Sequence, residues 1–149
     1  MIVANDILFS NVKSEIKAGK EVKITAKGNS MLPFIRTGDT VVLGKAHRLR
    51  TGMVVLVEPQ EGVYILHRIV KLGENEMTLY GDGNLGIKEV VPYTSVIAVV
   101  KSVCRGSKQI FYGSLNWKVR NFLWPKNKFL RKYSLKIYRK TQKNTKFVN

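Results

Sequence analysis

The fold of this chain is decided by one stretch, residues 28–39, which reads GNSMLPFIRTGD. The stretch is unsuited to a core strand, because Gly28 permits an unusual backbone conformation and Pro33 has a fixed φ and no N–H to donate. The pattern predicts that Ser30 lies on a rigid surface turn, where a nucleophile can be presented. The alternative is that the stretch is an ordinary turn and that Ser30 has no catalytic role.

Strand-like patterns lie on both sides of this stretch. No helical pattern interrupts the series, and Gly, Asn, Asp or Pro separate its members, so we predict a mainly β fold, with a coiled antiparallel or barrel-like sheet. The spacing of Leu8, Val12 and Ile16 predicts a short amphipathic helix over residues 5–18. The predicted strands cover residues 22–26, 40–43, 53–57, 63–70, 77–80 and 96–103.

The charge divides the chain into two parts. Residues 1–100 hold 12 Lys or Arg and 10 Asp or Glu, whereas residues 101–149 hold 14 Lys or Arg and no acidic residue. A chain of 149 residues suits one domain with an appendage. We therefore predict a β domain over residues 1–108 and a basic, aromatic helical tail over residues 109–149. Two short amphipathic helices are expected there, with apolar stripes through Leu115, Val119, Phe122 and Leu123 and through Phe129, Leu130, Tyr133 and Ile137.

Composition excludes several classes of protein. Cys104 is the single cysteine and there are two histidines, so neither a disulfide framework nor a structural metal is expected, and no cofactor is predicted. The sequence contains no apolar run of roughly 20 residues and no secretory leader pattern. We expect a protein of the cytoplasm or of the cytoplasmic membrane surface.

A serine hydroxyl is a weak nucleophile, so Ser30 needs a base. His67 lies within the strand-like run YILHRIV, and alternation places it on the face opposite Leu66 and Arg68. Its imidazole titrates near neutral pH, as a general base should. The alternative is a structural histidine in the core. His47 lies in a loop-like segment and has no comparable support.

A general base works better when a third group fixes its tautomer. The segment GDGN at residues 81–84 offers Asp82 for that purpose. Asp-Gly is also a strong hairpin signal, and both roles can hold together because a turn can present the carboxylate to His67.

The three blocks GNSMLPFIRTGD, VYILHRIV and LYGDGN occur in an order that resembles the serine peptidase superfamily of signal peptidases and LexA-like repressors. Most bacterial members have a lysine where this chain has His67, and the histidine is similar to archaeal, endoplasmic-reticulum and sporulation-type signal peptidases. The resemblance implies peptide-bond cleavage through an acyl-enzyme, with Ser30 as nucleophile, His67 as base and Asp82 as its orienting or electrostatic support. It also implies a substrate bound as an added strand, beside Met31 and Pro33.

The chain departs from the family pattern at two positions that matter. Gly28 stands where signal peptidases have a hydroxyl residue of the oxyanion hole, so the N–H groups of Ser30 and Asn29 are expected to do that work. A second acidic residue after the Gly-Asp block is replaced at best by Glu89.

The predicted function is therefore a signal-peptidase-like serine endopeptidase that cleaves a leader, signal or precursor peptide. The alternative is a non-catalytic binding or regulatory module of the same fold. For the basic tail, residues 113–140 favour an anionic membrane surface, because cations and aromatics suit the headgroup boundary. Nucleic acid and an acidic protein partner are the alternatives.

Overall fold

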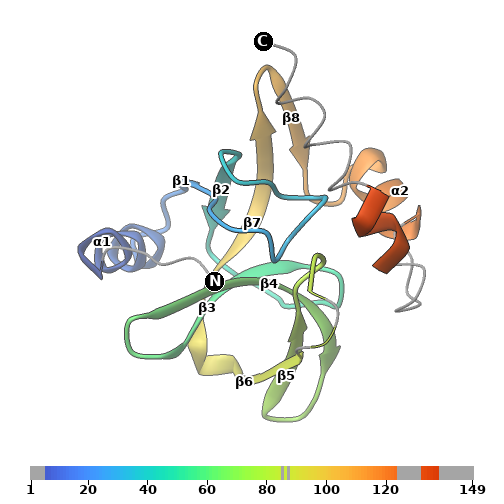
Figure 1. Ribbon diagram of the computed structural model, residues 1–149. Coiled ribbons are helices and arrows are strands. Elements are labelled where there is room, and N and C mark those ends of the chain that lie inside the picture. Colours follow the sequence, from blue (N-terminus) through green and yellow to red (C-terminus); the bar gives the residue numbers. More distant parts are fainter. Residues whose placement is uncertain (1–5, 85, 87, 124–131, 138–149) are drawn as a thin grey trace.

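The computed structural model describes residues 6–84, 86, 88–123 and 132–137 (Figure 1). The described residues form one eight-stranded antiparallel sheet with a helix at each end of the chain order, so the predicted mainly β fold is confirmed. The elements are α1 (Asp6–Lys17), β1 (Val22–Thr25), β2 (Thr40–Gly44), β3 (Val54–Gln60), β4 (Val63–Leu72), β5 (Glu76–Tyr80), β6 (Lys88–Pro92), η1 (Tyr93–Ser95), β7 (Val96–Arg105), β8 (Lys108–Phe111) and α2 (Leu115–Leu123).

The strand order is β1-β2-β7-β3-β4-β5-β6, and β8 pairs with β7 outside this path. In Figure 1 the strands β2, β7 and β8 rise above β3 and β4, while β5 and β6 curl round below, so the sheet is strongly coiled. Strands β6 and β8 were not predicted. Each is short, and β6 ends in Pro92, which cannot donate to a ladder and suits an edge.

The coiled sheet buries apolar side chains on both faces. In β3, Val54 and Leu56 belong to one hydrophobic cluster, and Val55 and Val57 belong to another. All four side chains are fully buried, which explains why β3 reads as an uninterrupted apolar run rather than an alternating one.

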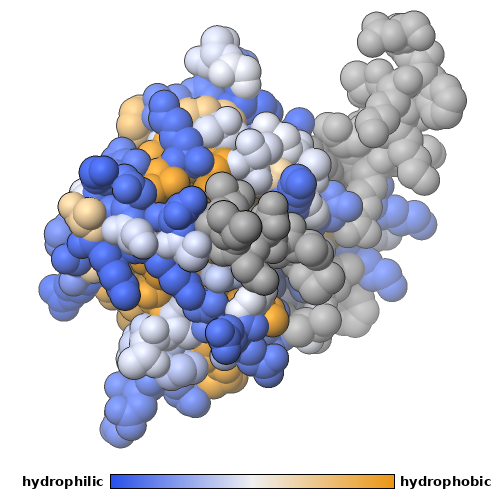
Figure 2. Space-filling model, turned by 90° about the vertical axis from the view of Figure 1, so that its left-hand side faces the viewer, coloured by the Kyte–Doolittle hydropathy of each residue, from blue (hydrophilic) through white to orange (hydrophobic). Residues whose placement is uncertain are grey.

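Helix α1 covers the first cluster. Phe9, Val12 and Ile16 are buried in it, and the ring of Phe9 stacks on Tyr64 of β4 with centroids 4.2 Å apart. The predicted helix is confirmed, although the side chain of Leu8 lies outside the described residues. Figure 2 shows the face of the molecule on the α1 side, where hydrophilic side chains dominate and apolar ones show only between them.

The first part of the basic C-terminal region packs on the β domain. The predicted boundary after residue 108 falls inside β8, which pairs with β7, and Trp117 of α2 is buried in the first cluster. The first tail helix is confirmed as α2. Residues 132–137 are helical, but Phe129 and Leu130 of the second predicted stripe lie outside the described residues. Within the described residues, no helix has the length and apolarity needed to cross a bilayer.

Candidate active site

The loop that carries Ser30 is closed at its ends and anchored underneath. The N–H of Gly28 donates to Oγ1 of Thr37 (3.0 Å), and that hydroxyl donates back to the carbonyl of Gly28 (3.0 Å). Gly28 has φ of 93°, a conformation that favours glycine. Phe34 is buried in the first core cluster, so the loop cannot lift away without exposing apolar surface. Ser30 itself is half-buried.

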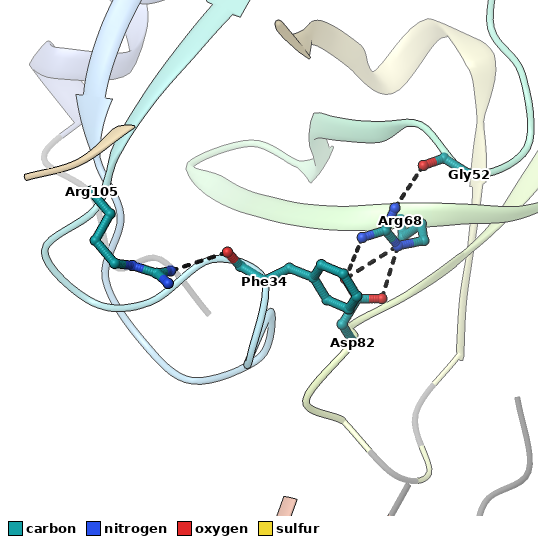
Figure 3. Close-up of polar contacts among 5 residues, drawn as sticks. All are labelled: Phe34, Gly52, Arg68, Asp82 and Arg105. Atoms are coloured by element: carbon teal, nitrogen blue, oxygen red, sulfur yellow. Dashed lines mark hydrogen bonds and ion pairs between the residues drawn. The ribbon is translucent and has the colours of Figure 1, made fainter. Parts of the chain in front are cut away.

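A second anchor holds the far end of this loop. The carboxylate of Asp39 accepts hydrogen bonds from Nε (2.8 Å) and Nη2 (2.5 Å) of Arg105 and from the N–H of Arg36 (2.8 Å). Nη2 of Arg105 also donates to the carbonyl of Phe34 (3.2 Å), as Figure 3 shows. The Gly-Asp pair that ends the GNSMLPFIRTGD stretch is therefore structural, since it ties the loop to β7.

His67 is buried in β4, with 3% of its surface exposed. Its Nδ1 lies 2.6 Å from Oε2 of Glu89, which is on β6, two strands away. A carboxylate can only accept, so Nδ1 carries the proton and Nε2 is left with its lone pair. Nε2 is buried and has no hydrogen-bond partner in the described part of the chain.

Gly81, directly after β5, has no side chain and so leaves room for the imidazole of His67. A Cβ added at Gly81 would lie 2.9 Å from Nε2 of His67 and 2.6 Å from the carbonyl oxygen of Ser30. The two groups therefore border a space that a single methyl group would overfill. The N–H of Gly83 donates to the same Ser30 carbonyl (2.7 Å), which fixes the serine backbone beside the histidine. The structure thus brings the backbone carbonyl of Ser30 near the imidazole of His67, from segments 37 residues apart in the sequence.

Burial lowers the pKa of His67 below its ordinary value, because the imidazolium is poorly solvated inside the sheet. The charge and hydrogen bond of Glu89 act in the opposite direction and raise the pKa of His67, but desolvation dominates. A neutral imidazole with a free Nε2 is the form that can accept a proton at neutral pH.

Asp82 has a different partner from the one we expected. Its carboxylate binds Arg68, with Nε 2.9 Å from Oδ1 and Nη2 2.6 Å from Oδ2 (Figure 3). The hydrogen bond to His67 Nδ1 comes from Glu89 instead. The physical reason is alternation: consecutive residues of β4 point to opposite faces, and Asp82 lies on the face of Arg68. Asp82 still contributes to the pKa of His67, which its charge raises.

Arg68 contacts several other segments in addition to Asp82. Its Nη1 donates to the carbonyl of Gly52 (2.8 Å), and its guanidinium carbon lies 5.0 Å from the ring centroid of Phe34 and 5.6 Å from that of Trp117. Figure 3 shows the Phe34 ring against Arg68 while the Phe34 carbonyl faces Arg105. The arginine thus joins the Ser30 loop, the Asp82 turn and α2 on one side of β4.

The remaining predicted site residues divide between open and buried positions. The N–H groups of Asn29 and Ser30 donate no hydrogen bond within the residues that the structure describes. Pro33 is half-buried, whereas Met31 packs in the first core cluster and offers little surface to a peptide. A groove of about 520 Å³ beside His47 involves none of these residues.

Residues 6–104 match the family model described as Peptidase S24-like. The chain belongs to the peptidase S24-like family. This family is part of the LexA/signal peptidase serine peptidase superfamily, so the resemblance seen in the sequence is confirmed. It includes non-catalytic members as well as peptidases. No curated protein matches the chain.

Proposed function

We propose that this S24-like protein is a serine endopeptidase that cleaves a leader, signal or other precursor peptide. Ser30 is the nucleophile, His67 the general base and Glu89 the group that orients His67. One observation carries the proposal: Nδ1 of His67 is bound by a carboxylate, while its buried Nε2 has no partner and borders the space beside the Ser30 carbonyl. A satisfied core histidine would have both nitrogens paired.

Acylation follows from this arrangement. Oγ of Ser30 attacks the scissile carbonyl carbon as Nε2 of His67 takes the hydroxyl proton, and the carbonyl π electrons move onto oxygen. The N–H groups of Ser30 and Asn29 donate to that oxyanion. The intermediate then collapses, the peptide C–N bond breaks, and Nε2 returns the proton to the leaving amine. Water repeats the sequence on the ester and releases Ser30.

Glu89 serves two purposes in this scheme. Its hydrogen bond keeps the proton on Nδ1, so that Nε2 is the basic nitrogen, and its charge stabilises the imidazolium that forms during each step. Asp82 supports His67 more weakly through its charge and, through Arg68, holds the turn that contacts Ser30.

The substrate is proposed to bind as an extended strand. β1 is an end strand of the sheet, and the chain runs from its last residue, Thr25, directly into the Ser30 loop. An outer strand edge offers unpaired N–H and C=O groups that a peptide can use for β-augmentation. A peptide paired there would be carried toward Ser30.

The proposal is tested with a fluorophosphonate probe, whose phosphorus is attacked by an activated serine oxygen so that fluoride leaves and a phosphonate ester forms. We expect a covalent adduct at Ser30 in the wild-type chain and none in Ser30→Ala, with Ser107→Ala, an exposed serine in the β7–β8 turn, labelled like wild type. Absence of an adduct from folded wild-type protein would overturn the catalytic assignment. New protein N-termini that appear in cells expressing wild type but not Ser30→Ala would then identify the substrate.

A non-catalytic binding module is the second candidate, and two observations favour it. Oγ of Ser30 makes no hydrogen bond to Nε2 of His67 in the described residues, and Gly28 stands where a hydroxyl is usual. Catalytic hydrogen bonds often form only when substrate is present, so a peptidase without substrate can also lack this bond. The probe distinguishes the two candidates, because a binding module leaves it unreacted.

A further inference from the structure

Helix α2 has an apolar face that is exposed in the part of the chain that the structure describes. Leu115, Val119 and Phe122 have 77%, 44% and 87% of their surface exposed, and their spacing of four and three residues places them on one side of the helix. Trp117 lies on the opposite side and is 4% exposed. α2 therefore packs on the core through one face and presents a second apolar face to the outside.

Other exposed apolar side chains occur near this helix in the chain. Phe111 at the end of β8 is largely exposed, and so are Tyr133 and Ile137. Figure 1 draws α2 and residues 132–137 on the same side of the molecule, away from α1. Single exposed apolar residues are ordinary on a soluble protein, but a helical stripe with further aromatic neighbours is typical of an interaction surface.

The charge of this region defines its partner. Residues 101–149 carry 14 Lys or Arg and no acidic residue, and Lys118 on α2 and Lys132 and Lys136 beyond it are exposed. A bare excess of positive charge suits nucleic acid as well as lipid. Nucleic acid, however, gains little from burying Leu and Val, whereas the headgroup boundary of a bilayer accepts apolar and cationic side chains together.

We propose that the outer face of α2, formed by Leu115, Val119 and Phe122 with the neighbouring lysines, docks on a membrane surface containing anionic phospholipid. The apolar stripe inserts at the headgroup boundary, and the lysines contact the lipid phosphates. This surface is separate from the proposed peptidase site and does not depend on its activity.

The docking face and the candidate site are joined by one residue. Trp117, on the inner side of α2, lies 5.6 Å from the guanidinium carbon of Arg68, which is next to His67 in β4. A bilayer bound to the outer side of α2 would therefore hold the Ser30 loop close to the membrane surface. A peptidase placed in this way would meet precursor peptides that are bound to the same bilayer.

Flotation with lipid vesicles tests the proposal on the full chain. We expect wild type to float with phosphatidylcholine vesicles that contain one quarter phosphatidylglycerol, and at least about tenfold less with phosphatidylcholine alone. Leu115→Ser/Phe122→Ser should weaken binding to the anionic vesicles by about 10- to 100-fold, because two large apolar side chains no longer insert.

A matched control replaces two exposed apolar residues elsewhere. Val70→Thr/Val90→Thr changes side chains of β4 and β6 that are also exposed, and it should float like wild type. Circular dichroism confirms that all variants are folded. Equal flotation of Leu115→Ser/Phe122→Ser and wild type would overturn the proposal. So would retention of wild type by a single-stranded oligonucleotide at physiological salt without flotation on either kind of vesicle.

Discussion

His67 and Arg68 are neighbours in β4, yet they belong to two different regions of the molecule. Each points to its own face of the sheet, and each binds one carboxylate from outside β4: Glu89 for the histidine and Asp82 for the arginine. The nitrogens of Arg68 that donate, namely Nε, Nη1 and Nη2, all have acceptors within 3.2 Å. His67 instead keeps one buried nitrogen unpaired.

The difference separates a structural ion pair from the pair to which we assign a catalytic role. A buried polar atom without a partner lowers the stability of a fold, so its presence beside a serine calls for a functional explanation. Arg68 and Asp82 satisfy one another and clamp three segments, and we expect their loss to reduce stability. Loss of His67 or Glu89 should reduce turnover instead.

The largest expected effect is on reaction rate. His67→Ala removes the proton acceptor of Ser30, and we expect the rate of fluorophosphonate labelling to fall by about 10²- to 10⁴-fold while the protein stays folded. The labelling reaction is quenched at a series of times, and intact mass spectrometry of each sample gives the rate. His47→Ala, which removes the other, exposed histidine, is the control and should label at the wild-type rate.

The next effect is on stability. Arg68→Ala leaves the Asp82 carboxylate buried without its cation, and we expect the free energy of unfolding to fall by about 3–5 kcal/mol. Urea denaturation followed by tryptophan fluorescence measures the change. Replacing the exposed Arg48 by Ala is the matched comparison and should change stability by less than about 0.5 kcal/mol. An equally small loss of stability for Arg68→Ala would mean that the Arg68–Asp82 ion pair does not stabilise the fold.

A smaller change in rate should distinguish the two carboxylates. Glu89→Gln keeps an acceptor near Nδ1 but removes the charge that raises the pKa of His67, so we expect about 100-fold slower labelling and an acid limb displaced to lower pH. Asp82→Asn should leave the acid limb close to wild type, since its charge contributes less to His67. If Asp82→Asn moved the limb as far as Glu89→Gln, the division between the two pairs would be wrong.

The smallest effect is the pH dependence of stability that comes from His67. Because burial lowers its pKa in the folded state, the unfolded chain binds more protons between that lowered value and about 6.5. The free energy of unfolding should therefore decrease as the pH falls from about 6.5 toward the folded-state pKa. Thermal unfolding at several pH values should show a shallower decrease for His67→Gln. An identical slope would indicate that His67 does not contribute to the dependence.

Much of the fold could be predicted because the strands are long and apolar. Six strands and both terminal helices follow from hydrophobic period and turn residues. Motifs identified Ser30 and His67 as candidate site residues, and alternation correctly predicted that His67 and Arg68 lie on opposite faces of β4. The sequence indicates Glu89 only as a replacement for the family's second acidic residue, and its contact with His67 could not be predicted, because it is made across β5 from β6, a short strand that the sequence pattern does not reveal. The role of Gly81 likewise depends on register, which the sequence does not contain.

Because Trp117 is part of the core, the folded domain extends further along the chain than the family match does. The match ends at residue 104, but the first core cluster also includes Trp117, and the C-terminal half of β7 pairs with β8. A fragment that ended with the match would lack β8, which would expose the edge of β7. It would also lack Trp117, whose ring would no longer fill the space beside Arg68. For recombinant expression, the shortest autonomous fragment should therefore extend through α2, whatever the homology alone suggests.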